Sequence, residues 1–275
     1  SRPKKDRIQI VNKLYNDGYV SILNAVGYPN PTRSHFRSMD IWHTAPNSDE
    51  YRKYGWLGRY MDAYCENSHS MLEIDSRLSL SLSGKYRNGL AVKNSGSLYK
   101  SLNSSYYDQI IHAAQESDLN EDNQGYLYKT LIQTDQSAKY LSETHAIKND
   151  NYKFPKTTLG NKLSKVSQFI RSGYNTQVYY VSQSGYDSHV AQRKNQDRLL
   201  KDYSNSIYAF VESLKKAGEF DNTLILTFSE FGRRVKENGS SGTDHGKANN
   251  LFLIGKNLKR PGIYNQAPDL FNLDF

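Results

Sequence analysis

The chain has 275 residues, a formal net charge of +8 at pH 7 and a single cysteine, Cys65. This length allows one large α/β domain or two small ones, with a core that needs no disulfide bonds. One cysteine excludes an intrachain disulfide, and no apolar run approaches the ~20 residues of a membrane-spanning helix. The basic charge can attract anionic ligands, but no basic block interleaved with aromatic residues favours nucleic acid.

Helix and strand patterns alternate in the first third of the chain. Apolar residues recur at helical spacing from Ile8 to Tyr15, and Gly18 ends that predicted helix. A mostly buried strand is predicted at 19–27. Further on, "RSMDIWHTA" and "GWLGRYMDAYCEN" predict helices, with Cys65 as a partly buried structural thiol, and "LSLSLSG" alternates as a strand does.

The middle of the chain gives weaker patterns. The segment 97–115 predicts a helix, and another helical stretch extends to about His145. The sequence "KNDNYKFPKTTLGN" is typical of a linker, and we expect it to connect parts of one domain.

The last 110 residues have the strongest pattern. They predict the helix "KLSKVSQFIRSG", the strand "TQVYYVSQSG", a long amphipathic helix from Gln192 to Gly218, and the strands "NTLILTF" and "NNLFLIG". This order is typical of a mostly parallel sheet covered by helices.

Polar groups adjoin four of the predicted strands. The loops carry Thr32, Arg33, Ser34 and His35; Asp187, His189 and Gln192; Ser229, Glu230, Arg233 and Arg234; and Asp244 with His245. Ligands of open parallel sheets bind beyond the carboxyl ends of the strands, so we expect the four loops to meet in one crevice.

Each group also has an ordinary structural interpretation. Asp187 and His189 can face one zinc, manganese or iron ion, or Asp187 can cap the next helix while His189 stays exposed. Glu230 can act at a site or pair with a nearby arginine. Ser34 can be a nucleophile that a metal or His35 activates, or it can cap the following helix.

Several of these segments resemble a known family. "VGYPNPTRSHFRSMDIWHTA", "GYDSHVAQ" and "LTFSEFGRRVKENGSSGTDHGKANNLFLIG" are similar to the bacterial proteins called domain of unknown function 1501, from about Leu14 to the end. That family resembles the alkaline phosphatase-like superfamily. The resemblance implies a single domain over residues 1–275, built as a three-layer α/β/α sandwich and lacking the family's first strand and C-terminal segment. It also implies an exported or periplasmic protein.

The resemblance further implies a metal-dependent hydrolase of a sulfate or phosphate ester, with zinc, manganese or calcium as cofactor. The implied metal ligands are Asp187, His189, Asp244 and His245, with Asp244 either a ligand or an orienting residue. Ser34, His35 and Glu230 are the candidate catalytic residues. Arg33 and Arg233 are expected to contact the substrate, a small anionic ester or a sulfated or phosphorylated glycan.

Two departures from the superfamily pattern favour an alternative. Where the superfamily has an Asp-His pair, one alignment places Glu230 and Phe231, and another places Asp244 and His245. A phenyl ring cannot ligate a metal, and Pro29 at the sulfatase cysteine position excludes formylglycine chemistry there. These departures and the 22 tyrosines favour a non-catalytic exported protein that uses the same fold for binding or assembly.

Overall fold

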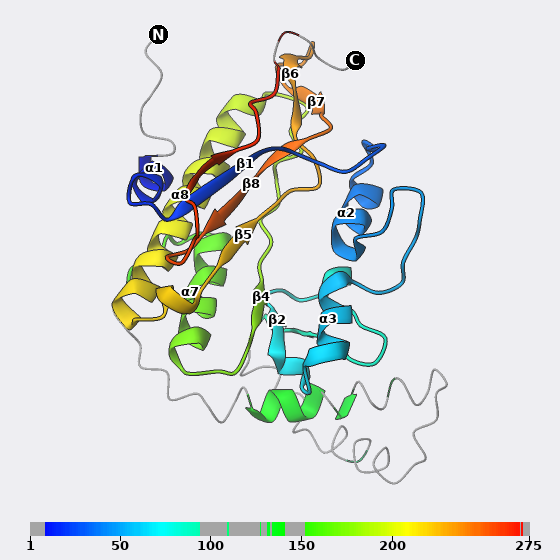
Figure 1. The fold of residues 1–275 in the computed structure, drawn as a ribbon, viewed down its shortest axis with the longest axis vertical. Helices are drawn as coiled ribbons and strands as arrows, with labels where there is room; N and C mark the ends of the chain where they lie inside the picture. The colour runs from blue at the N-terminus through cyan, green and yellow to red at the C-terminus, as the bar shows by residue number, and fades with distance from the viewer. Residues whose placement is uncertain are drawn as a thin grey trace.

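Figure 1 shows the computed structural model of the chain, which describes residues 9–93, 152–269, 109, 127, 131, 132, 134–140 and 271. The helix predicted at 97–115 lies almost wholly outside these residues. The helical stretch expected up to His145 is described as helix at 134–140. The fold is mixed α/β, and none of the described helices is long and apolar enough to cross a membrane.

The first sheet has four strands in the order β5 (Ile225–Thr227), β8 (Asn249–Ile254), β1 (Val20–Val26) and β9 (Gly262–Tyr264). Strand β8 is antiparallel to both β1 and β5, and only the β1–β9 pair is parallel. This sheet is therefore mixed, where the pattern predicted a mostly parallel one. Because β8 runs against β1 and β5, the residues that follow β1 and β5 emerge at the same edge as those that precede β8.

The second sheet is parallel, and only its strand β4 (Val178–Tyr180) belongs to the strands from which a parallel sheet was predicted. Its other strands are β3 (Leu90–Ala91) and β2 (Met71–Glu73), with β2 in the centre. All three carboxyl ends therefore lie at one edge. A separate antiparallel hairpin consists of β6 (Arg233–Glu237) and β7 (Thr243–His245).

Three helices lie beside the strands on the left of Figure 1: α1 (Gln9–Asn16), α7 (Thr158–Arg171) and α8 (Gln192–Ala217). The long helix thus matches the predicted amphipathic helix. Its apolar stripe joins the main core, in which Leu14, Val20, Val211, Leu214 and Ile254 are fully buried. Each such side chain stabilises the fold by about 1.5–3 kcal/mol relative to exposure.

A smaller core lies between α3 (Trp56–Tyr64) and the second sheet, and α2 (His35–Thr44) contacts α3 and the segment Leu80–Leu82. The core contains Met61, Cys65, Met71 and Leu82, so Cys65, predicted to be partly buried, is buried. Helix α3 approaches the next segment backbone to backbone, because a Cβ on Gly58 would lie 2.2 Å from the Ser83 carbonyl oxygen.

The strand predicted for "LSLSLSG" is wrong. The structure places the 3-10 turns η1 (Ser68–Ser70), η2 (Leu80–Leu82) and η3 (Phe220–Asn222) along the chain, and η2 occupies the predicted strand. The Ser79 amide donates to the Glu73 carboxylate, and the Ser79 and Ser81 hydroxyls lie 2.9 Å apart. These local bonds replace a strand ladder, and the alternation arises because Leu82 is buried in the smaller core.

Candidate metal centre

Four chain segments meet at the edge that the ends of β1 and β5 share with the start of β8. They are the first turn of α2, the segment from Asp187 to His189 beyond β4, the residues after β5, and strand β7. The prediction that the four polar loops converge is therefore correct for most of their residues.

The turn between β6 and β7 fixes the position of His189. Asn238 Nδ2 donates to the His189 carbonyl at 3.0 Å, and Asn238 Oδ1 accepts from the Ser240 and Gly242 amides. A Cβ on Gly242 would lie 2.2 Å from the His189 carbonyl oxygen, so only glycine allows this approach. The hairpin therefore holds the loop that carries Asp187 and His189 in place.

The Asp187 carboxylate lies at the centre of the cluster. Its Oδ1 is 2.9 Å from His189 Nε2, 3.0 Å from His245 Nε2 and 2.9 Å from Arg233 Nη1. Its Oδ2 is 3.1 Å from His35 Nε2. Three imidazoles thus turn the same ring nitrogen toward one carboxylate, an arrangement that brings four potential metal ligands together.

An acceptor lies behind each of these imidazole rings. The Nδ1 atom of His35 is 2.7 Å from Glu230 Oε1, and that of His245 is 2.7 Å from the Arg33 carbonyl oxygen. The Nδ1 atom of His189 is 3.5 Å from Asp244 Oδ1. Metal-ligating histidines typically donate their second ring N–H to a carboxylate or a backbone carbonyl in this way.

The acceptor behind His245 determines where its proton lies. A carbonyl oxygen only accepts, so the hydrogen bond from Nδ1 requires a proton on Nδ1. In the neutral ring, Nε2 then has a lone pair that faces Asp187 Oδ1 and lies 3.0 Å from His189 Nε2. Electron-rich atoms this close together are stabilised when a proton or a cation lies among them. The same reasoning applies to His35, because Glu230 accepts from its Nδ1.

The donor atoms fit a small divalent ion. Asp187 Oδ1, His189 Nε2 and His245 Nε2 form a triangle with sides of 2.9, 3.0 and 3.0 Å. Ligands at the usual distances around a tetrahedral zinc ion are about 3.3 Å apart, so a small outward movement accommodates one. The ligand atoms of His35, Asp187 and His245 also all lie within 4.8 Å of one another.

His35 supplies an independent indication. Its Nε2 atom is buried and has no hydrogen-bond partner among the described residues, although it lies 3.1 Å from Asp187 Oδ2. A buried nitrogen of this kind costs roughly 1–3 kcal/mol when unsatisfied. A metal ligand role satisfies this atom, and the sequence had suggested only a catalytic role for His35.

The electrostatics of the cluster keep Asp187 ionised. Burial alone would raise the pKa of Asp187, but its contacts with His245 and Arg233 and the nearby His35 and His189 hold that pKa well below its ordinary value. The pKa of Asp244 is lowered as well, chiefly by a hydrogen bond from Asn238. The centre therefore presents anionic oxygen over the whole physiological pH range.

Arg233 is held within the cluster. Besides Asp187, its guanidinium donates to the Thr243 hydroxyl at 3.3 Å and to the Thr243 carbonyl, and its side chain is 16% exposed. These contacts position the Asp187 carboxylate. The expected contact between Arg233 and the substrate stays a prediction.

Glu230 is held from three sides. Its carboxylate accepts from His35 and, at 3.1 Å, from the Ser229 hydroxyl, while the Trp42 indole donates to its carbonyl at 3.0 Å. The ion pair with a neighbouring arginine, considered from the sequence, does not form. No sequence pattern pointed to Trp42, since it lies inside a helix with no polar companion.

Several contacts expected from the sequence do not form. Helix α8 begins after Ala191, so Asp187 does not cap it. Asp244 contacts His189 and not His245, which the Arg33 carbonyl orients instead. Ser34 occupies the cap position of α2, but its exposed hydroxyl makes no capping bond. The exposed Arg33 side chain makes no hydrogen bond or ion pair with a described residue, so its substrate role and the nucleophilic role of Ser34 stay predictions.

Phe231 closes one side of the centre. Its buried ring lies 4.8 Å from the His35 ring and 4.5 Å from the His245 ring, measured between centroids. An apolar wall stands at the position where one alignment expects a histidine ligand. The arrangement therefore suits one ion better than two.

Comparisons with known proteins agree with the family resemblance. The family model described as "Protein of unknown function (DUF1501)" matches residues 24–272, so the chain belongs to this family. No curated protein matches it. A solved structure titled "Crystal structure of Ps i-CgsB" is similar at 13% identity and a TM-score of 0.34. The match covers 94% of this chain and 62% of that one, and a likeness this weak carries no argument.

Proposed function

We propose that the chain is a metal-dependent hydrolase of an anionic ester, sulfate or phosphate, with a single divalent ion at the candidate metal centre. The convergence of three imidazole Nε2 atoms on the Asp187 carboxylate carries this proposal. The resemblance to the alkaline phosphatase-like superfamily, with its three-layer α/β/α sandwich and its exported members, is consistent with it.

The donor set limits the choice of ion. Asp187, His189 and His245 would hold the ion, with His35 as the fourth ligand. Imidazole nitrogen suits zinc or iron and carboxylate oxygen suits manganese, whereas calcium takes six to eight oxygen ligands. Of the three metals expected from the resemblance, this centre therefore favours zinc or manganese.

The residues around these ligands have separable roles. Such an ion, when bound, acidifies a coordinated water and stabilises negative charge on the ester oxygens. Glu230 keeps His35 in the tautomer with a free Nε2 lone pair, and the Arg33 carbonyl does the same for His245. Arg233 holds Asp187 in place through its guanidinium.

Two charged or polar groups remain available for the substrate. Arg33 and Ser34 are exposed next to His35, and neither side chain is engaged by a described residue. Arg33 can reach an anionic ester through bidentate hydrogen bonds. Under this proposal a small anionic ester, or the ester of a sulfated or phosphorylated glycan, binds beside the first turn of α2.

One observation favours the non-catalytic alternative. Phe231 packs on two of the histidines, so the second ion that assists many phosphate-transferring enzymes has no ligand on that side. A binding or assembly protein could use the ion only to hold its loops together. Turnover decides between the two functions.

The experiment combines metal content with turnover. The full chain is purified with zinc or manganese supplied, its metal stoichiometry is measured, and aryl phosphate and aryl sulfate esters are offered. We expect about one ion per chain, and loss of both the ion and turnover in His245→Ala.

His69→Ala serves as the matched control, because His69 stacks on Tyr140 and takes no part in the hydrogen bonds or ion pairs described for the centre. It should retain the ion and turnover. A chain that binds no ion under either supplement contradicts the metal centre. A chain that binds the ion but cleaves neither ester supports the non-catalytic alternative.

A further inference from the structure

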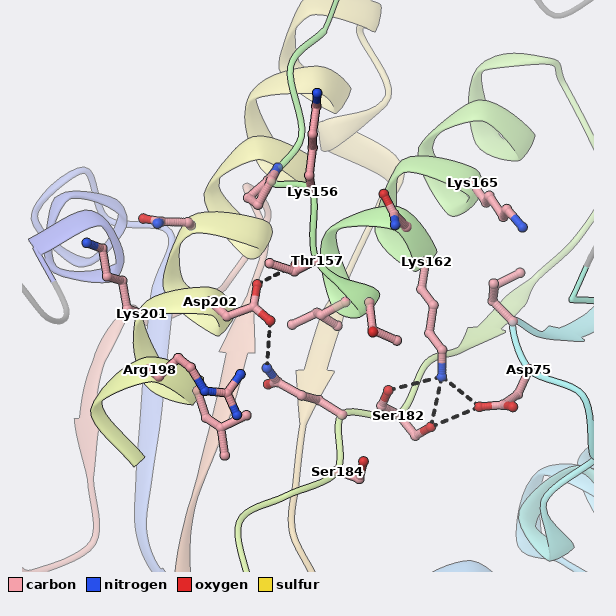
Figure 2. Close-up of a pocket in the computed structure, with 18 of the residues that line it drawn as sticks. Asp75, Lys156, Thr157, Lys162, Lys165, Ser182, Ser184, Arg198, Lys201 and Asp202 are labelled. Atoms are coloured by element: carbon pink, nitrogen blue, oxygen red, sulfur yellow. Dashed lines mark hydrogen bonds and ion pairs between the residues drawn. The ribbon is translucent and has the colours of Figure 1, made fainter. Parts of the chain in front are cut away.

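A large open cleft lies at the carboxyl ends of the three parallel strands of the second sheet. Its volume is about 1210 Å³, and it is lined by residues that follow β2, β3 and β4 and by the facing parts of α7 and α8. Figure 2 shows this cleft. Ligands of parallel sheets bind beyond the carboxyl ends of the strands, so its position is that of a ligand site.

Basic residues dominate the charge of the cleft. Its lining includes six basic residues and two acidic ones, a net of four positive charges: Lys93, Lys156, Lys162, Lys165, Arg198 and Lys201 against Asp75 and Asp202. The whole chain has a net charge of +8, so half of that excess lies around one cleft. A cleft lined by one sign of charge concentrates ligands of the opposite sign.

Both acidic side chains are already engaged. Asp75 accepts from Lys162 at 2.6 Å, and Asp202 accepts from the Thr157 hydroxyl at 2.6 Å and from Gln183 at 3.2 Å (Figure 2). Their contacts point toward neighbouring protein groups and leave little anionic oxygen to repel a ligand. The lysine bound to Asp75 also holds the strand ends against α7.

Other basic side chains have no acidic partner. Lys156, Arg198 and Lys201 are exposed and make no ion pair with any residue that the structure describes, and Arg198 donates only to the Asn195 side chain. In Figure 2, Arg198 and Lys201 lie on the opposite side of the cleft from Asp75, and Lys156 lies above them. The lining also includes neutral donors, among them Ser182, Ser184 and Asn161.

The size and spread of these groups indicate an extended ligand. Pockets for single small molecules are about 300–1,000 Å³, and this cleft exceeds that range. The unpaired cations lie on two separate elements, the segment before α7 and the helix α8. A ligand with several spaced anionic groups can contact cations on both elements.

We propose that this cleft binds a ligand that carries two or more phosphate or sulfate groups, through Lys156, Arg198 and Lys201. The cleft also adjoins the metal centre along the chain. Ser184 in the cleft is three positions before Asp187 in the sequence, so their Cα atoms are at most about 11 Å apart. If the proposed hydrolase function holds, the cleft would bind the flanking anionic groups of a substrate whose ester lies at the ion; only this last step depends on that function.

The test is a titration of the full chain with two probes, linear tripolyphosphate and a heparin-derived sulfated hexasaccharide. We expect at least one probe to bind, with an affinity that falls as salt is added. The probe that binds identifies phosphate or sulfate as the preferred group. In Lys156→Glu/Arg198→Glu the affinity should fall at least about tenfold, because two contacts become repulsive.

Lys53→Glu/Lys216→Glu is the matched control. It changes the net charge by the same amount at exposed positions outside the cleft, and the affinity should change less than about twofold, since distant surface charges are screened. Equal losses in the two double variants, or no binding of either probe, would overturn the proposal. So would binding confined to a DNA oligonucleotide offered under the same conditions.

The metal-centre variant separates this inference from the proposed function. His245→Ala should keep its affinity for the probe within about twofold, because His245 does not line the cleft. Loss of probe binding in His245→Ala would show that the probe binds at the metal centre instead. Failure of the chain to bind metal would leave the cleft unaffected.

Discussion

The candidate metal centre and the basic cleft organise their charges in opposite ways. In the metal centre, each imidazole has an acceptor behind it and a carboxylate in front, and the hairpin turn fixes the loop that carries them. In the cleft, Lys156 and Arg198 are exposed and have no acidic partner among the described residues. The first region is preorganised for one small cation. The second presents flexible cations that suit a larger anionic ligand of less defined geometry.

This difference shows what each region requires of the fold. A metal needs ligand positions accurate to a few tenths of an ångström, so its residues depend on partners that fix ring orientation. A charge-based cleft tolerates side-chain motion, because long-range attraction does not depend on one geometry. Substitutions should therefore have large, specific effects in the metal centre and smaller, additive effects in the cleft.

Replacement of Asp187 should give the largest effect and tests the metal side of the comparison. Asp187→Ala removes the carboxylate that all three imidazoles face and leaves Arg233 without its anionic partner. We expect metal affinity to fall more than about 100-fold, beyond the 10–100-fold typical of residues that only support a ligand. Competition with a coloured chelator measures this affinity.

Asp187→Asn is the matched control for shape, since it keeps the size of the side chain and removes its charge. Its metal affinity should fall nearly as far, because an amide oxygen is a weaker ligand than a carboxylate. An unchanged metal affinity in both variants would show that Asp187 is not a ligand. The contrast between a preorganised metal centre and the basic cleft would then be wrong.

Replacement of Glu230 should have an intermediate effect and sharpens the distinction between ligands and supporting residues. Glu230→Ala removes the acceptor for His35 Nδ1, so the ring loses its fixed tautomer. Metal affinity should fall about 10–100-fold. Glu230→Gln keeps an oxygen acceptor, so it should recover much of this loss in the same competition assay. Equal affinities for the Ala and Gln variants would argue against an orienting role.

Replacement of Asp75 should give the smallest effect and tests the cleft side. Asp75→Asn frees Lys162 and adds one positive charge to the cleft, so polyanion affinity should rise by roughly twofold to threefold. The metal affinity should stay unchanged. A fall in polyanion affinity would contradict the account of the cleft.

The same variant has a pH-dependent effect on stability. Hydrogen bonding to Lys162 is the first of the contacts that lower the pKa of Asp75 from 3.8 to about 2. Because the folded pKa lies below the unfolded one, the stabilisation is fully present above about pH 4 and is lost as the pH falls through about 2. The Asp75 side chain is 36% exposed, so the pair contributes at most about 1 kcal/mol. Urea unfolding should show that the free energies of unfolding of the unchanged chain and of Asp75→Asn differ less at pH 3 than at pH 6.

Much of the metal centre could be predicted from the sequence. His35, Asp187, His189 and His245 each follow or precede an apolar strand, and the topology rule brings such positions together. The rule worked although the sheet is mixed, because β8 runs against β1 and β5 and its amino end lies at their carboxyl edge. Strand direction itself has no local signal, so the mixed sheet could not be foreseen.

Other features depend on contacts distant in the sequence. The orientation of His245 depends on the Arg33 backbone carbonyl, which lies 212 residues away and is present whatever the side chain. The cleft gathers its cations from separate segments near 93, 156–165 and 198–201, so no basic block marks it. Part of the apparent linker "KNDNYKFPKTTLGN" contributes Lys156 and Thr157 to that cleft.

Anomalous diffraction from crystals of the zinc-supplemented full chain tests directly whether an ion binds among Asp187, His189 and His245. We expect one strong anomalous peak at zinc-ligand distance, about 2.0–2.2 Å, from Asp187 Oδ1 and the Nε2 atoms of His189 and His245. His35 Nε2 at ligand distance from the same peak would complete a site with four ligands. A map with no peak among these atoms, at full zinc supplementation, would contradict the metal centre.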